Sequence, residues 1–348
     1  MGEGGEAGEY SRRLAAFPRL LRVTLTPFLL MLRSVCAALL LGMLPPVSAQ
    51  SYPAKTIRII APFVPGAGTD TLARTLAPPL TKALGQNIIV ENRPGAGTVV
   101  GTEVAARAPA DGHTLLIIAN SFTINPAVRS KLPYDSLKDF AGVARIASTP
   151  MVFAVHPSVP VKSIKEMIAL ARASPGALNY ATSGAGTGHH LAGELFKSLA
   201  KIDMIHVPYN GGAAATIAVL GGHASVLLVN VLSVVPHVPA GKLRPVAVTA
   251  LERVEVMKGV PTVAESGFPG FDTAIWFGSV VPAATPRDII NRLSTEILRA
   301  LQLPEVKGVI DRLGLNAAGL PAGEFDAYLR LEMQQNAKIA RAVNLRID

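Results

Sequence analysis

The sequence predicts an α/β protein of two domains, and three observations support this. Its 348 residues correspond to roughly two domains at the usual size of about 100–200 residues each. Hydrophobic residues make up 49% of the chain and charged residues only 16%, which excludes intrinsic disorder. Short β-branched runs alternate with amphipathic stretches, which is typical of βαβ units and a largely parallel sheet.

The first 49 residues are expected to form a secretory signal. Arg33 precedes an apolar run from Val35 to Leu44, which is shorter than the roughly 20 residues that a membrane span needs. Val47-Ser48-Ala49 has the small residues of a cleavage site, so we expect cleavage after Ala49. Export would place the protein in the periplasm.

The start of this segment is open to interpretation. Met31 alone begins a signal of ordinary proportions, so we expect residues 1–30 to be an over-extended reading frame. Arg12 and Arg13 give a faint twin-arginine pattern, but further arginines interrupt what would be its apolar region.

The cysteine content and the net charge limit which cellular compartment and which partners are expected. The single cysteine, Cys36, lies inside the predicted signal, so the exported chain has no disulfide and no thiolate metal site. Export without disulfides fits a bacterial periplasm. The net charge is +9, but after residue 50 no segment combines basic and aromatic residues as a nucleic-acid surface would, so no nucleic-acid partner is expected.

Strands and helices follow one another along the exported chain. β-branched runs predict strands at 57–61, 88–91, 114–119, 151–155, 178–181, 204–207, 225–229 and 245–249. Apolar residues at three- and four-residue spacing predict helices at 69–84, 164–173, 188–199 and 213–220. After Trp276, itself expected to be a core anchor, we expect helices only, at 288–301, 304–313 and 323 to about 342.

The first predicted strand runs into the glycine-rich segment from Pro62 to Asp70, and a helix follows at once. Glycines let backbone N–H groups approach a ligand, and a helix N-terminus attracts anions. The segment lacks the Gly-Lys-Ser/Thr of a P-loop and the full dinucleotide fingerprint, so no nucleotide cofactor is expected. The alternative is an ordinary turn in which Asp70 stabilises the first helical turn.

A second segment, from Thr182 to His190, repeats this arrangement, and Asn210 with Gly211 and Gly212 opens another helix. Two such loops facing each other would hold the two ends of one anion, and a dicarboxylate fits that geometry. The hydroxyls of Thr182, Ser183 and Thr187 supply further donors.

Two catalytic interpretations of the second segment are weak. His189 and His190 are adjacent, so on a helix they point about 100° apart and do not face one metal ion. Ser183 lacks the Gly-x-Ser-x-Gly context of a hydrolase nucleophile. We therefore expect no metal site and no enzymatic activity.

Several motifs, in their order along the chain, resemble the Bug-type receptors, the extracytoplasmic solute-binding proteins of tripartite tricarboxylate transporters. The resemblance covers nearly the whole exported chain. It rests on Pro62-Phe63-x-Pro65-Gly66-x-Gly68-x-Asp70, Glu91-Asn92-Arg93-Pro94-Gly95-Ala96-Gly97, Asp111-Gly112-His113, Leu132-Pro133-Tyr134-Asp135, Val207-Pro208-Tyr209, Gly241-Lys242-Leu243-Arg244, the segment 260–267, Trp276-Phe277-Gly278 and Thr285-Pro286.

The resemblance implies a type II periplasmic binding protein fold, in which two α/β domains are joined by two hinge segments with the ligand cleft between them. Domain 1 would comprise residues 50–150 and 272–348, and domain 2 residues 151–271. Family receptors hold a carboxylate through backbone amides, hydroxyls and water.

The resemblance also implies which residues bind the ligand. One wall would consist of Phe63, Pro65, Gly66, Ala67, Asp70, Asn120 and Ser121. The opposing wall would consist of Thr182, Ser183, Gly186, Thr187, His190, Tyr209, Asn210 and Gly211. Ser225 and Val229 replace residues that are commonly acidic, which argues against an amino-acid ligand needing an ammonium partner.

The function implied is a periplasmic receptor that captures a small organic carboxylate for the membrane subunits of a tripartite transporter, acting as a monomer without a cofactor. One alternative is a sensor that presents the same ligand to a membrane signalling protein. Another is an exported hydrolase using Ser183 and His190. Citrate, C4 dicarboxylates, and aromatic or nicotinic acids all remain open as ligands.

Overall fold

The computed structural model describes residues 52–347, and the predicted signal segment lies outside this range. The strands are β1 (Ile57–Ala61), β2 (Ile88–Asn92), β3 (Thr114–Ala119), β4 (Phe140–Val155), β5 (Asn179–Thr182), β6 (Ile205–Pro208), β7 (Val226–Asn230), β8 (Arg244–Val248), β9 (Ala274–Pro282) and β10 (Asn316–Pro321). The α-helices are α3 (Gly68–Leu84), α4 (Val99–Ala106), α5 (Ser121–Val128), α6 (Ile164–Ala173), α7 (Gly188–Ala200), α8 (Gly212–Leu220), α9 (Arg287–Ala300), α10 (Pro304–Arg312) and α11 (Ala322–Ala342). Short 3₁₀ helices are η1 (Ala96–Thr98), η2 (Val231–Ser233), η3 (Val235–His237) and η4 (Glu255–Met257).

The strands form one mixed sheet with the order β2-β1-β3-β9-β4-β7-β5-β6, and β8 and β10 also pair with β4. β1 pairs in parallel with β2 and β3, and β5 with β6 and β7. Pairings that involve β4 or β9 are antiparallel. The expectation of a largely parallel sheet is therefore wrong, because these two long strands run against their neighbours.

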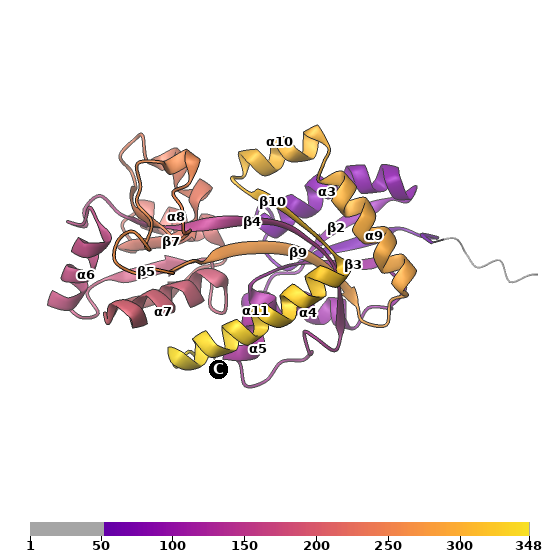
Figure 1. The fold of residues 1–348 in the computed structure, drawn as a ribbon, viewed down its shortest axis with the longest axis horizontal. Helices are drawn as coiled ribbons and strands as arrows, with labels where there is room; N and C mark the ends of the chain where they lie inside the picture. Colours follow the sequence, from indigo (N-terminus) through magenta and orange to yellow (C-terminus); the bar gives the residue numbers. More distant parts are fainter. Residues whose placement is uncertain (1–51, 348) are drawn as a thin grey trace, which may run out of the picture. The chain divides into compact units, whose positions relative to one another are not determined.

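β4 and β9 connect two α/β halves, as Figure 1 shows. Along its first part, up to Pro150, β4 pairs with β9. From Met151 onward it pairs with β7 instead. The change of partner at adjacent residues makes β4 common to both halves.

The helical tail predicted after Trp276 is interrupted by strands, so that part of the prediction is wrong. β9 contains Trp276 and is buried from Ile275 onward, so it lacks the alternating pattern that marks a half-buried strand. β10 is a short, mostly exposed strand of small residues, which give little strand signal. The helices predicted around these strands are present as α9, α10 and α11.

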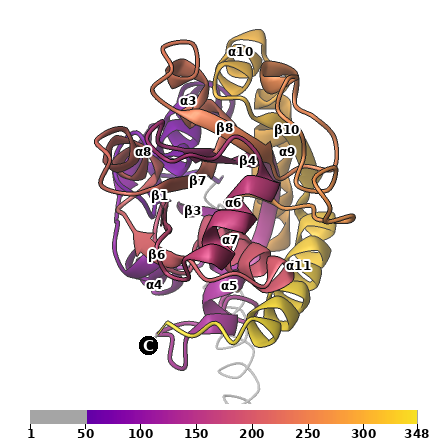
Figure 2. The same cartoon turned by 90° about the vertical axis from the view of Figure 1, so that its left-hand side faces the viewer.

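Trp276 anchors the packing beneath the sheet, as predicted. Its side chain is 1% exposed. Its Nε1–H donates to Oε2 of Glu332 at 2.8 Å, which satisfies the buried indole. Glu332 lies on α11, and Figure 2 shows this helix passing beside α5. α11 therefore returns the end of the chain to the first half of the fold.

Within residues 52–347, no helix combines the length and apolar character needed to cross a lipid bilayer.

Candidate functional site

Four helices, α3, α5, α7 and α8, begin around one cavity, each shortly after the carboxyl end of a strand. The cavity has a volume of about 510 Å³, and Gly68, Ser121, Gly188 and Gly212 are among its lining residues. Helix N-termini present unpaired N–H groups and about half a positive charge each. This convergence makes the cavity suited to an anion.

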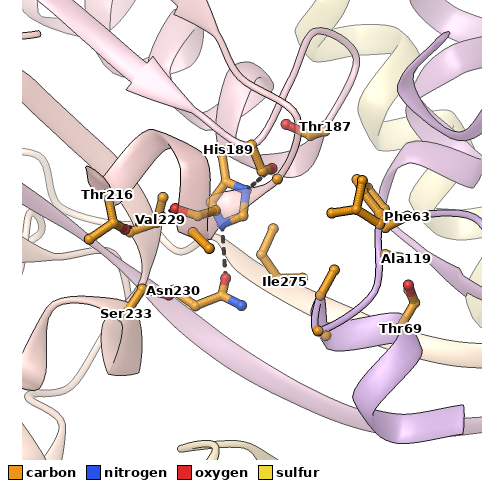
Figure 3. A pocket seen from close by; sticks show the side chains of 18 of the residues that line it. Phe63, Thr69, Ala119, Thr187, His189, Thr216, Val229, Asn230, Ser233 and Ile275 are labelled. Atoms are coloured by element: carbon orange, nitrogen blue, oxygen red, sulfur yellow. Dashed lines mark hydrogen bonds between the residues drawn. The ribbon is translucent and has the colours of Figure 1, made fainter. Parts of the chain in front are cut away.

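The lining contains no lysine, arginine, aspartate or glutamate from the described part of the chain. Figure 3 shows Phe63 and Thr69 on one side of the cavity and Thr216 and Ser233 on the other. The positive potential therefore comes from backbone dipoles and neutral donors rather than from a cationic side chain.

The loop before α3 is fixed by Asp70. Its Oδ2 accepts from the Gly66 N–H at 2.8 Å, and its Oδ1 accepts from Arg74 Nε and Asn92 Nδ2, both at 2.9 Å. Burial acts to raise the pKa of this carboxyl, but the hydrogen bonds outweigh it and hold the pKa below its usual value. Asp70 thus shapes the loop and does not line the cavity.

Thr69, next to Asp70, lines the cavity at the start of α3. Its side chain is 1% exposed, yet its Oγ1 has no hydrogen-bond partner among the described residues. A buried hydroxyl without a partner is costly. This hydroxyl is therefore available to a ligand.

Asn120 and Ser121 form the adjoining wall at the start of α5. The Asn120 amide donates to the Ala274 carbonyl at 3.1 Å and accepts from the Trp276 N–H at 3.0 Å. Ser121 Oγ accepts from Thr98 Oγ1 at 3.0 Å. These bonds tie the wall to β9 and to η1.

A chain of hydrogen bonds crosses the opposite wall. Ser183 Oγ lies 2.7 Å from His189 Nδ1, and His189 Nε2 lies 2.8 Å from Asn230 Oδ1, as the dashed lines in Figure 3 show. Burial lowers the pKa of His189 to about 4 against the opposing effect of its bond to Asn230, so the imidazole is neutral at pH 7. All three residues line the cavity.

Because the His189 ring is neutral, the donor and acceptor of each hydrogen bond in this series are determined. With its proton on Nε2, His189 donates to Asn230 and accepts at Nδ1 from the Ser183 hydroxyl. Ser183 is then left with lone pairs for a ligand, and Asn230 with its two N–H donors. The wall therefore offers both a donor and an acceptor.

His190 lies behind the second loop and not in the cavity. Its ring stacks on His206 with centroids 3.7 Å apart, and its Nδ1 accepts from the Gly186 N–H at 3.3 Å. Thr182 Oγ1 is likewise turned to His206 Nε2, at 2.7 Å. Burial lowers the pKa of His190 to about 4 and that of His206 to about 3, so this stack is neutral as well.

Thr187 performs two tasks at the start of α7. Its side chain caps the helix by accepting from the His190 N–H, and its hydroxyl donates to the Gly184 carbonyl at 2.7 Å. These two bonds fix the loop against the first turn of α7.

The sequence-predicted site residues divide into two groups. Those that line the cavity are Phe63, Pro65, Gly66, Ala67, Asn120, Ser121, Ser183, Thr187, Asn210 and Gly211. Those outside the lining are Asp70, Thr182, Gly186, His190 and Tyr209. A role of either group in ligand binding stays a prediction.

Sequence reasoning missed several lining residues, notably Thr69, His189, Asn230 and the apolar residues of α8 and η2. Asn230 ends β7, and the carboxyl ends of strands are where open α/β sheets bind ligands, so its position was a usable signal. In the sequence, the His189-His190 pair indicates only a metal or catalytic site, which is weak, and not a residue that lines a binding cavity. No group of three or more His, Cys, Asp or Glu able to hold a metal occurs between residues 52 and 347.

Comparison with known proteins gives consistent matches. A family model described as tripartite tricarboxylate transporter family receptor matches residues 72–345. Protein BugT of Bordetella pertussis is 33% identical over 308 residues, which covers 88% of this chain and 94% of that protein.

Two solved structures resemble this fold over most of its length. R. palustris Rpa4515 with adipate is 31% identical with a TM-score of 0.80, covering 85% of this chain and 99% of that one. The periplasmic binding protein BugD is 26% identical with a TM-score of 0.78, at 85% and 99% coverage.

Proposed function

Since the chain belongs to the tripartite tricarboxylate transporter receptor family, we propose that it is a periplasmic receptor that captures a small organic carboxylate and delivers it to the membrane subunits of a tripartite transporter. The convergence of the N-termini of α3, α5, α7 and α8 on one cavity carries this proposal. The adipate bound to Rpa4515 supports it.

Backbone dipoles are an effective way to hold such a ligand. Each helix N-terminus stabilises a nearby anion by about 0.3–1 kcal/mol, and by up to about 2 kcal/mol where it is partly buried. An uncharged wall also releases its ligand without breaking a buried ion pair, whose rupture costs about 3–5 kcal/mol. Capture and delivery are both compatible with this arrangement.

Closure of two domains on the ligand is part of the proposal. We place the boundaries at residues 50–150 with 272–348 for one domain and 151–271 for the other. The change in β4 pairing between Pro150 and Met151 supports a hinge there. Small-angle scattering should show compaction on addition of a saturating acid, and an unchanged profile would count against the clamp.

Export and assembly complete the proposal. Removal of residues 1–49 would release the receptor into the periplasm as a monomer. N-terminal sequencing of protein from a periplasmic extract should begin at Gln50, and size-exclusion chromatography with light scattering should give one subunit mass.

The chain Ser183–His189–Asn230 invites the hydrolase alternative, but its chemistry argues against it. The third position is an amide and not a carboxylate, so its hydrogen bond stabilises an imidazolium less than a carboxylate would, and burial outweighs it. With its pKa lowered to about 4, His189 is also a weak general base at pH 7. We therefore assign these residues to binding and propose that the protein is not an enzyme.

A thermal-shift screen of the purified protein tests the proposed function, after unfolding and refolding to strip retained ligand. At about one hundred times its dissociation constant, a true ligand stabilises the native state by about 2.7 kcal/mol. The melting temperature should rise by roughly 4 °C with one class of carboxylates. If the native refolded protein shows no response to mono-, di- or tricarboxylates, the proposal is wrong.

A further inference from the structure

The cavity extends beyond the helix N-termini along one face of α8. Gly212, Ala213, Thr216, Ile217 and Leu220 all line it, and their spacing places them on one stripe of the helix. At 1.5 Å per residue, this stripe reaches roughly 12 Å from the first turn of α8.

The walls of this extension are mostly apolar, and Ser233 of η2 and His237 of η3 are polar side chains in the same lining. Ile217 and Leu220 of α8 share it with Leu232 of η2 and Pro236 of η3. The Thr216 hydroxyl donates to the Gly212 carbonyl at 2.8 Å within its own helix, so it is already satisfied. We name these residues, 216, 217, 220, 232 and 236, the α8 groove.

Ile217 stands out within the groove because its side chain is 69% exposed. An exposed large aliphatic side chain at the edge of a ligand cavity gains stability once apolar surface covers it, at about 0.8 kcal/mol per methylene buried.

The polar end of the same cavity lies at Thr69, on the first turn of the 17-residue helix α3. Its hydroxyl is buried and has no partner, so this helix N-terminus carries a second, independent sign of a ligand oxygen. The cavity thus joins a seat for one carboxylate to an apolar groove.

We propose, on the basis of the function proposed above, that the ligand is an elongated acid whose carboxylate contacts Thr69 and whose uncharged hydrocarbon body occupies the α8 groove. A second carboxylate at the far end of such a ligand would lie beside Leu220 and Pro236, beyond the first turn of α8, where the helix dipole no longer stabilises charge and His237 is the one polar side chain that η3 adds to the lining. Straight-chain fatty acids of medium length have this chemistry.

Isothermal titration calorimetry at pH 8 tests the proposal with monoacids of increasing length and with a monoacid and a diacid of equal length. Butyrate, hexanoate and octanoate should bind with affinities that rise about fourfold per added methylene. Octanoate should bind at least tenfold more tightly than suberate, the diacid of the same length.

Three variants assign the two ends. Thr69→Val removes the hydroxyl at nearly constant shape and should weaken all three monoacids by a common factor of about ten. Ile217→Ala should weaken octanoate about fourfold and leave butyrate unchanged. Leu199→Ala is the control, because Leu199 is 52% exposed and lies outside the cavity lining.

The outcomes separate this inference from the proposed function. If suberate and adipate bind more tightly than octanoate and hexanoate, or if affinity does not depend on monoacid length, the hydrocarbon proposal is overturned while carboxylate capture stands. If none of these acids binds to the native refolded protein, the hydrocarbon proposal is overturned, and carboxylate capture is overturned as well only if the wider thermal-shift screen is also negative. A Thr69→Val variant that keeps full affinity refutes the assignment of Thr69 as a contact of the ligand carboxylate.

Discussion

Gly97 provides a sharp test of domain closure, because it touches the other side of the proposed hinge. A Cβ added at this position would lie 2.5 Å from the carbonyl oxygen of Ala185. That separation is well below van der Waals contact, so one loop must move. We therefore expect Gly97→Ala to favour the open arrangement and to weaken ligand binding.

The magnitude follows from two separable effects. Gly97 has φ +61°, so alanine there costs about 1–2 kcal/mol of local strain. The clash with Ala185 adds about 1–3 kcal/mol, the usual cost of overpacking, and only in the closed arrangement. Binding affinity should thus fall by roughly 5- to 150-fold.

Gly85→Ala is the matched control for this experiment. Gly85 has a similar φ of +71°, but an added Cβ would meet nothing within 4 Å. Both variants should lose similar stability to strain in denaturant unfolding, whereas only Gly97→Ala should lose affinity in calorimetry and resist compaction in small-angle scattering. Equal affinities of the two variants would refute the closure argument.

Three further predictions concern the residues that support the cavity. Asp70→Asn places an NH₂ group against either the Gly66 N–H or the Arg74 and Asn92 donors, so denaturant unfolding should show a loss of about 2–3 kcal/mol in stability. A loss of less than about 0.5 kcal/mol, which is typical of substitutions on the surface, would contradict this prediction. Ser183→Ala removes the hydrogen bond that holds the His189 ring and, through it, the Asn230 amide, so acid binding should weaken by about 1–2 kcal/mol in calorimetry, and discovery of a hydrolytic activity that this variant abolishes would overturn its assignment to binding. Burial lowers the pKa values of His189, His190 and His206 below the ordinary value, so the unfolded state binds more protons than the folded state as pH falls from about 6.5 toward 4. The free energy of unfolding should therefore be full above pH 6.5 and fall by about 1–2 kcal/mol per histidine at pH 5. A denaturant midpoint that does not change between pH 7.5 and pH 5 would exclude this linkage.

Much of the fold follows from local patterns in the sequence. The strands near 57–61 and 114–119 and the helix at 164–173 have the bounds that β-branched runs and apolar periodicity indicate. β9 and the first part of β4 were missed because they are buried on both faces, where continuous apolar runs replace alternation. Long crossing strands of this kind depend on tertiary pairing, which one sequence does not display.

The candidate site was predictable to a similar depth. Glycine-rich segments directly before helices coincide with three of the places where the cavity wall forms, at Gly66, Thr187 and Gly211, and their role in binding stays a prediction. Side-chain direction was not predictable in the same way. Asp70 and His190 belong to the predicted motifs, yet hydrogen bonding turns Asp70 to its own loop and stacking turns His190 to His206. The α8 groove left no motif, because apolar residues on a helix usually indicate core packing.

Carboxylate capture by neutral donors is the central claim, and a comparison of acids with their amides tests it most directly. Straight-chain mono- and diacids should be titrated into the stripped, refolded protein beside the corresponding amides, which have nearly the same shape and no charge. The account predicts that at least one acid binds at least tenfold more tightly than its amide, since helix N-termini favour the anion. Equal affinity of each acid and its amide, or binding of amides alone, would contradict it.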